Sequence, residues 1–303
     1  MDFEEFAWAM GETQMIEYVK SCFAGKKPLE QGLHAKAMLL FRQYMIVGGM
    51  PKPLAIYIES ERDFRKVDEE KRDILALYRN DIRKIKAKYK TKVLAIYDQI
   101  PGFLSKSEKR VVMSKIEKGA TFPKYHDTFF WLSDSMIVNE CFNCSDPNVG
   151  LSLNEDRTYI KCYMNDTGLL ISHTFDENEI SDSKLYKDLL SSKLSVNEGM
   201  FYENIVAQML TAAGHKLYFY NHYNQDKKRN DVEIDFILSN DSKLKYKIYP
   251  IEVKSTEKYT TTSLKTFKGK FTKRIGGSYV IHPKNLKVED DVTYIPAYMT
   301  FCL

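Results

Sequence analysis

Three residues in the last third of the chain have the types and spacing of a metal-dependent site, with two carboxylates that could hold a divalent cation and a lysine beside them. Asp235 ends an acidic alternation, and Glu252 and Lys254 lie two residues apart in a second extended segment. Carboxylate oxygens are the ligands that Mg²⁺ or Mn²⁺ prefers, and two carboxylates leave coordination positions for water and a phosphate oxygen. Lys254 would share a strand face with Glu252, where its ammonium could orient an attacking water or stabilise a phosphorane-like transition state. Glu203, on a helix upstream, could reach the cation directly or through a water.

The Glu-x-Lys spacing alone is weak evidence, because surface strands often alternate in this way. In this chain the spacing stands beside apolar strand residues, Ile248, Ile251 and Val253, and an acidic residue on a neighbouring strand. The same charged side chains would also suit a buried ion-pair network that supports the fold without chemistry. The sequence therefore leaves both interpretations open, a metal-dependent site and a structural network.

The segments from residue 197 to residue 303 alternate between helical and extended patterns. The expected elements are a helix over Glu198–Ala213, strands over Lys216–Asn221 and Asp231–Leu238, a return strand over Lys243–Tyr249 that leads through Pro250 into residues 251–254, a helix from about Ser263, and a strand over Ser278–Ile281. This order resembles a PD-(D/E)XK nuclease-like α/β domain with a mixed sheet. Its basic loop, Lys227, Lys228 and Arg229, is the candidate nucleic-acid-binding segment.

The first 88 residues are expected to form a helical region. Apolar residues recur at helical spacing through Leu33–Val47, and Gly48-Gly49 followed by Pro51 is typical of a helix end. A long amphipathic helix is expected over about residues 62–86, with its charged side facing solvent.

Residues 89–175 have the element order of a winged helix-turn-helix domain. The expected elements are helices over Val93–Gln99, from a capping-box-like Ser105–Glu108 to Lys118 and over Phe122–Asp134, then strands over Met136–Phe142 and Thr158–Tyr163. The third helix would read a DNA groove, but it is strongly apolar, so the pattern supports the fold better than it supports DNA reading. The polar stretch 176–196 is the expected linker. The expected fold class is thus α+β or α/β.

Bulk composition is that of an ordinary globular chain and does not by itself indicate a nucleic-acid partner. The 303 residues are 44% hydrophobic and 28% charged, and the net charge is only +4. No stretch approaches the ~20 apolar residues of a membrane helix, and the acidic start is unlike a signal peptide. With five scattered cysteines, we expect a cytoplasmic protein with reduced thiols. Cys141 and Cys144 form a lone C-x-x-C without further zinc ligands nearby, which favours ordinary thiols.

Several phrases of the sequence occur in the order in which a known family has them. They are DFEEFAWAMG at Asp2–Gly11, LFRQYMIVGGMP at Leu40–Pro51, KRDILALYRNDIRKI at Lys71–Ile85 and IEVKS at Ile251–Ser255. Over nearly the whole chain, the sequence resembles the C-terminal half, a domain of unknown function, of bacterial and archaeal AAA+-type ATPases. The resemblance implies a winged-helix part followed by a PD-(D/E)XK-like domain, whose motif falls on Glu203, Asp235, Glu252 and Lys254.

The ATPase half of that family would precede Asp2. No G-x-x-x-x-G-K-[ST] phosphate-binding loop occurs in these 303 residues, and Gly269-Lys270 lacks the required neighbours. We therefore expect no ATP site and no ATP hydrolysis by this chain alone.

Three functions follow as expectations. The first is Mg²⁺- or Mn²⁺-dependent cleavage of DNA, and the second is a catalytically inactive module that binds nucleic acid or a protein. The third is a structural half of an ATPase that mediates subunit contacts. Basic clusters at Lys227–Arg229, Lys243–Lys247 and Lys265–Arg274 favour DNA as the partner, because each phosphate that is neutralised adds salt-dependent affinity.

Overall fold

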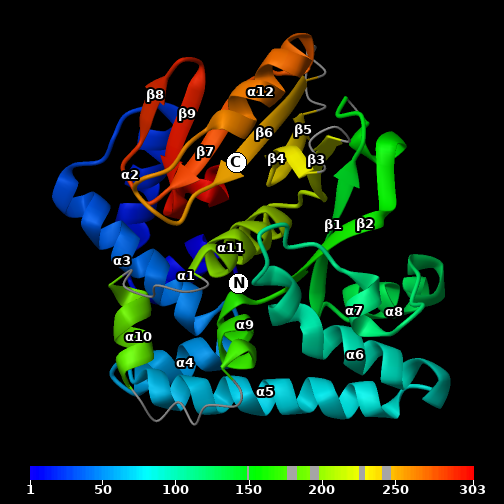
Figure 1. Cartoon of the computed structure of the whole chain (residues 1–303). Coiled ribbons are helices and arrows are strands. Elements are labelled where there is room, and N and C mark those ends of the chain that lie inside the picture. The colour runs from blue at the N-terminus through cyan, green and yellow to red at the C-terminus, as the bar shows by residue number, and fades with distance from the viewer. Residues whose placement is uncertain (149, 176–182, 192–197, 225–228, 241–246) are drawn as a thin grey trace. The chain divides into compact units, whose positions relative to one another are not determined.

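The computed structural model describes residues 1–148, 150–175, 183–191, 198–224, 229–240 and 247–303. The elements before Val138 are all helices, and the strands of two mixed sheets follow together with further helices (Figure 1), so the fold combines α and β structure as the sequence predicts. Within these ranges, no helix is both long enough and apolar enough to span a membrane.

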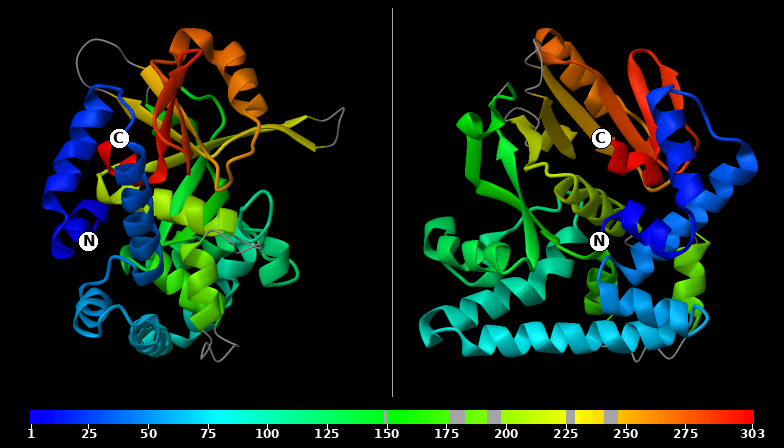
Figure 2. Two further views of the ribbon diagram at one scale, coloured as in Figure 1. Left: turned by 90° about the vertical axis from the view of Figure 1, so that its left-hand side faces the viewer. Right: turned by 180° about the vertical axis from the view of Figure 1, so that it is seen from behind.

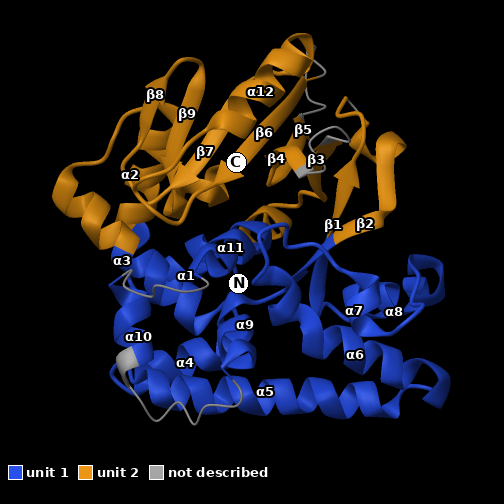
Figure 3. Ribbon diagram, in the orientation of Figure 1, with its two compact units in different colours: residues 1–13, 39–140, 161–208 blue, residues 14–38, 141–160, 209–303 orange. Residues whose placement is uncertain are grey.

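The described chain divides into two compact units (Figure 3). Unit 1 comprises residues 1–13, 39–140 and 161–208, and unit 2 comprises residues 14–38, 141–160 and 209–303. Each unit is therefore assembled from segments that are distant in sequence. The sequence-based division into 1–88, 89–175 and 197–303, by contrast, follows chain order. The expected linker 176–196 lies partly outside the described residues and contains α10 (Ser183–Leu190).

Unit 1 is mainly helical. It contains α1 (Phe3–Ala9), the second half of α3 (Gln31–Val47), α4 (Pro51–Glu59), α5 (Phe64–Lys84), α6 (Ala87–Leu104), α7 (Met113–Ile116), α8 (Phe122–Asp134), α9 (Thr167–Thr174), α10 and most of α11 (Glu198–Ala212). Helices α5 and α6 pack side by side, as Figure 2 shows from two further directions. The expected helices over Leu33–Val47 and about 62–86 are confirmed by α3 and α5.

The turn between α3 and α4 depends on glycine. Gly48 has a φ of +89°, and a Cβ at this position would lie 2.2 Å from Oδ1 of Asp166. Asp166 caps α9 by accepting a hydrogen bond from the Leu169 N–H, and its second oxygen accepts one from the Gly49 N–H. One buried carboxylate thus joins the turn to the start of α9.

A fully buried lysine supports the same turn. Lys71 is 0% exposed and donates a hydrogen bond of 2.8 Å from Nζ to the carbonyl oxygen of Ile46. Burial lowers the pKa of Lys71 to about 8, although the carboxylates of Asp68 and Asp166 oppose this decrease.

Helix α6 does not end where the sequence predicts. The expected end at Gln99 is wrong, because α6 continues through Pro101 to Leu104. Proline removes a backbone donor and strains a helix interior, but Ile100, Phe103 and Leu104 are all buried. The burial of these apolar side chains offsets the cost of the proline.

The helix expected between residues 105 and 118 is also mostly wrong. Only α7, Met113–Ile116, is helical in this stretch. Lys109 has a φ of +48°, outside the helical region, and Arg110 forms a β-bridge with Lys161. The third expected helix, by contrast, is confirmed at Phe122–Asp134 by α8.

The first sheet has the strand order β2-β1-β3-β4. Its strands are β1 (Val138–Cys144), β2 (Glu155–Met164), β3 (Leu217–Asn224) and β4 (Arg229–Ile234), and a 3-10 turn, η1 (Leu151–Asn154), precedes β2. Strand β1 pairs with β3 in parallel, and β3 pairs with β4 in an antiparallel manner. The two strands expected after α8 are therefore part of a larger sheet that strands from the last third of the chain complete.

Unit 2 also contains the second sheet, with the order β5-β6-β7-β9-β8. Its elements are β5 (Phe236–Asn240), β6 (Lys247–Val253), α12 (Thr262–Phe271), η2 (Thr272–Arg274), β7 (Ser278–His282), β8 (Lys287–Glu289), β9 (Val292–Pro296) and η3 (Ala297–Cys302), and α2 (Thr13–Ala24) and the first half of α3 belong to the same unit. Strands β6, β7 and β9 are parallel, and β5 and β8 are antiparallel edge strands. Strands β8 and β9 were not expected from the sequence.

The single strand expected over Asp231–Leu238 is wrong. The chain forms two strands in different sheets, β4 up to Ile234 and β5 from Phe236, with only Asp235 between them. Ile234 pairs with Tyr220 in the first sheet, whereas Phe236 pairs with Ile251 in the second. Because two sheets compete for neighbouring residues, the alternation that the sequence suggests does not continue past the end of β4.

Candidate functional site

Glu252 and Lys254 meet at the carboxyl end of β6. The Nζ of Lys254 lies 3.0 Å from Oε2 of Glu252, and the other carboxylate oxygen accepts a hydrogen bond of 2.8 Å from the Leu264 N–H in the first turn of α12. Glu252 is 2% exposed, and this burial raises its pKa, although Lys254 and the Leu264 N–H act against the rise. The helix start and the lysine thus hold one buried carboxylate between them.

Asp235 joins this pair from the break between β4 and β5. Its Oδ2 accepts a hydrogen bond of 2.8 Å from the backbone N–H of Val253, the residue between Glu252 and Lys254. The antiparallel pairing of β5 with β6 explains this position, because Phe236 lies opposite Ile251. All three predicted residues of unit 2 are therefore brought to the same end of β6.

This arrangement offers two carboxylates and one ammonium at the carboxyl end of β6, in the parallel part of the mixed sheet, where ligands commonly bind. No group of three or more His, Cys, Asp or Glu side chains with metal-binding geometry occurs among the described residues. A divalent cation held by Asp235 and Glu252 would therefore take most of its remaining oxygen ligands from water and a substrate phosphate. Such incomplete protein coordination is normal for Mg²⁺ at phosphoryl sites.

Glu203 belongs to unit 1, whereas Asp235, Glu252 and Lys254 belong to unit 2. The Glu203 carboxylate is 2.8 Å from Nζ of Lys109 and 3.0 Å from Nζ of Lys161, and it accepts a hydrogen bond from the hydroxyl of Tyr163. Burial acts to raise the pKa of Glu203, but the two lysines outweigh it and hold the pKa at about 2. Glu203 is thus a buried, ionised carboxylate with partners of its own, and its part in a metal site stays a prediction.

The predicted basic loop lies mostly outside the described residues. Lys227 and Lys228 lie outside the described residues, and Arg229 is placed only as the first residue of β4. Of the other predicted basic clusters, residues 243–246 also lie outside, and Lys265–Arg274 covers most of α12 and all of η2.

The C-x-x-C pair consists of two buried thiols that form no disulfide. Cys141 and Cys144 both lie in β1, and the Sγ of Cys144 donates to the carbonyl oxygen of Leu151. Burial raises the pKa of Cys144 to about 11, so the thiol stays protonated at neutral pH. A protonated, buried thiol is a poor zinc ligand and a poor nucleophile.

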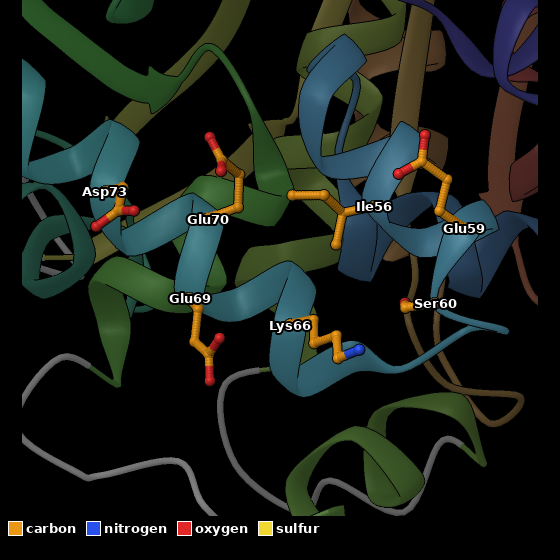
Figure 4. Close-up of a pocket in the computed structure, with 7 residues that line it drawn as sticks. All are labelled: Ile56, Glu59, Ser60, Lys66, Glu69, Glu70 and Asp73. Atoms are coloured by element: carbon orange, nitrogen blue, oxygen red, sulfur yellow. The ribbon is translucent and has the colours of Figure 1, made fainter.

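An acidic cavity of about 530 Å³ lies between α4 and α5 in unit 1 (Figure 4). Its lining residues are Ile56, Glu59, Ser60, Lys66, Glu69, Glu70 and Asp73. Glu70 is the most buried of these carboxylates and forms an ion pair of 2.8 Å with Lys52. The excess of negative charge makes this cavity unsuitable for a phosphate group.

Two family models match the chain. A domain of unknown function, DUF8612, matches residues 38–179, and a second domain of unknown function, DUF4143, matches residues 198–299. No curated protein and no solved structure shows significant similarity to the chain. The second match contains Asp235, Glu252 and Lys254 and begins one residue after the domain start expected from the sequence.

Proposed function

We propose that the chain acts on DNA through a PD-(D/E)XK-like site that hydrolyses phosphodiesters with Mg²⁺ or Mn²⁺. The observation that carries the proposal is the meeting of Asp235, Glu252 and Lys254 at the carboxyl end of β6. In this assignment the two carboxylates bind the cation, and Lys254 lies beside the attacking water.

The proposal includes the architecture expected from the sequence. A winged-helix-like part would comprise α6, α7, α8, β1 and β2, whose order along the chain supports it. An association with AAA+-type ATPases is supported by the match to DUF4143, a domain commonly found in AAA-associated proteins. An ATPase is therefore the proposed protein partner.

The reaction would be a displacement at phosphorus. The oxygen of a water forms a new P–O bond as the bond to the leaving sugar oxygen breaks. The attacking water releases a proton to solvent, and the leaving oxygen takes up a proton from solvent. A cation held by Asp235 and Glu252 would supply charge stabilisation and a more acidic water. The ammonium of Lys254 would stabilise the negative charge that develops on the phosphoryl oxygens.

A second candidate function is binding without cleavage, and the engagement of Glu252 favours it. One oxygen of this carboxylate accepts a hydrogen bond from the Leu264 N–H. The other forms an ion pair with Lys254, although it accepts no hydrogen bond within the described structure, and burial raises the pKa of Glu252. A cation would have to compete with the ion pair. An inactive module would keep the same three residues as structural support while other surfaces bind nucleic acid or a protein.

Calorimetric titration with Mn²⁺ tests the cation site. The wild type should release heat on binding, and a variant with Asp235→Asn and Glu252→Gln should not. Glu155→Gln is the matched control, because the Glu155 side chain is 4% exposed and is likewise paired with a lysine in unit 2, Lys216. Equal heats for the wild type and the double variant would refute the cation site.

A cleavage assay separates the two candidate functions. Labelled single- and double-stranded DNA are incubated with the wild type and with Lys254→Ala in the presence of Mn²⁺. Cleavage by the wild type that Lys254→Ala loses supports the enzyme. DNA that is bound with a steep salt dependence but stays intact supports the binding module.

A further inference from the structure

The corner between α5 and α6 in unit 1 concentrates positive charge. Residues 83–92, RKIKAKYKTK, contain six lysines and arginines and no acidic residue. The whole chain has a net charge of +4, so the residues outside this segment sum to −2. Residues 83–92, which we call the basic corner, are therefore a strong local concentration of positive charge.

The charges of the basic corner are open to solvent. Lys86 and Lys88 are exposed, and Lys90 is half-buried. Within the described parts of the chain, none of these three lysines forms an ion pair, whereas Lys84 pairs with Asp81 at 2.7 Å. Their charges are thus not neutralised by neighbouring carboxylates and are available to an external anion.

The local helix makes this concentration unfavourable without an anion. Lys86 is the N-cap of α6 and gives no side-chain cap, and the first turn of α6 has no acidic residue. Cations at a helix start oppose the helix dipole, and the first backbone N–H groups lack acceptors within the helix. Phosphate groups near the basic corner would relieve both effects.

The basic corner continues onto α8 through direct contacts. Lys92 donates a hydrogen bond of 2.9 Å to the carbonyl oxygen of Lys124, and its ammonium lies 4.9 Å from the ring centroid of Tyr125. The ammonium of Lys88 lies 5.5 Å from the ring centroid of Tyr89. Tyr125 is buried and Tyr89 is half-buried, so these rings position the ammonium groups, and the lysines supply the positive charge that attracts a phosphate backbone.

The charge along α5 restricts where a polyanion can lie. The acidic cavity is at residues 66–73 of α5, and the basic corner begins at Arg83, the penultimate residue of the same helix. Glu70 and Lys84 are separated by about 21 Å along the helix axis, at the usual rise per residue. A nucleic acid would be attracted to one end of α5 and repelled by the other.

A membrane surface is a less suitable partner for the basic corner. Interfacial helices need a large exposed apolar face, but Val93, Ile96 and Ile100 of α6 are buried. None of the large hydrophobic side chains exposed in the described structure falls within residues 83–92. The combination of dense charge with tyrosine and without exposed aliphatic groups favours nucleic acid.

We infer that the basic corner, residues 83–92 together with Lys124, binds the phosphate backbone of nucleic acid. This inference deepens the proposed function, on which it rests, because it places the substrate on unit 1 through contacts that need no cation. Phosphate contacts of this kind give affinity and position without reading sequence.

The test is binding of a short fluorescent DNA duplex, measured by anisotropy in EDTA at several salt concentrations. The triple variant Lys86→Gln, Lys88→Gln, Lys90→Gln should bind at least about tenfold more weakly at low salt. Its slope of log K against log salt should decrease by about 2 to 3, because each phosphate contact contributes about 0.9. The matched control is Lys26→Gln, Lys27→Gln, Lys284→Gln, which removes three exposed lysines of unit 2 that lie outside the predicted DNA-binding clusters.

The binding assay can refute the role of the basic corner independently of the proposed nuclease activity. Equal losses in the two triple variants, or no loss in the first, would overturn the inference. Co-sedimentation of the wild type with phosphatidylserine vesicles in the absence of DNA binding would assign the basic corner to membranes instead. The binding assay contains EDTA and so does not depend on a divalent cation. If the wild type binds DNA in EDTA but does not cleave it in the Mn²⁺ assay, the proposed nuclease activity is refuted and the DNA-binding surface is retained. Circular dichroism verifies that both variants are folded.

Discussion

Replacing Glu203 by glutamine should destabilise the protein by about 3 kcal/mol at neutral pH. Glutamine keeps the shape of the side chain but leaves Lys161, which is 0% exposed, without its carboxylate. The ordinary pKa of 4.5 and the value of about 2 in the folded state correspond to about 3 kcal/mol. This agrees in size with the cost of about 3 to 5 kcal/mol for removing one partner of a buried ion pair.

The destabilisation caused by Glu203→Gln should depend on pH. The folded pKa of Glu203 lies below its unfolded value, so the stabilisation is fully present above about pH 5 and is lost as the pH falls toward 2. The difference in unfolding free energy between wild type and Glu203→Gln should therefore decrease from about 3 kcal/mol at pH 7 to about 1 kcal/mol near pH 3.

Urea denaturation followed by circular dichroism measures this difference at each pH. Lys161→Met in the Glu203→Gln background should recover part of the loss, because it removes the uncompensated buried charge. A difference that stays constant from pH 7 to pH 3, or a variant as stable as the wild type, would refute the reasoning. A fully stable Glu203→Gln variant that loses DNA cleavage would instead assign the residue to the chemistry.

Two further substitutions in unit 1 test the buried network around the turn between α3 and α4. The unfolding free energy of the wild type should rise by about 3 kcal/mol between pH 8 and 10.5, because the unfolded state binds more protons there. Lys71→Met should abolish this rise, and urea denaturation of both proteins across this pH range measures the difference. Gly48→Ala should cost more than about 3 kcal/mol, since the new Cβ meets Asp166 as well as straining the backbone. Gly214→Ala shares the φ of +89° but meets no atom within 4 Å, so it should cost only about 1 kcal/mol, and equal melting temperatures for the two variants would contradict the role of Asp166.

Elements with strong local signals could be predicted from the sequence. Helix α8 begins and ends at the expected residues, because Pro123 marks its first turn and its buried residues recur at helical spacing. The pair Glu252 and Lys254 could be predicted for a similar reason, since residues two apart in an extended segment share a face, and Lys254 directly follows β6.

Features that depend on distant partners could not be predicted. The split at Asp235 results from competition between Tyr220 and Ile251 for neighbouring residues of one segment. The partners of Glu203 are equally remote, since Lys161 is 42 residues away along the chain. A local pattern contains no information on which of several distant strands or lysines will be the neighbour.

The charges of the basic corner are evident in the sequence, but no local pattern there predicts a site. Residues 83–86 fall at the end of the helix expected over about residues 62–86, and Lys88–Lys92 fall between it and the helix expected over Val93–Gln99. The contacts of Lys92 with Lys124 and Tyr125 connect these charges to α8, and so extend the basic corner to a second helix.

The passage from β4 to β5 has a mechanical consequence. Asp235 is the only residue between two strands that belong to different sheets, and its side chain is also tied to the backbone of β6. A one-residue connection is too short to let β4 and β5 move independently, so a displacement of β4 from the first sheet must also displace β5 in the second. The two sheets should consequently unfold as one cooperative unit, and a change at the Asp235 carboxylate should affect the stability of both.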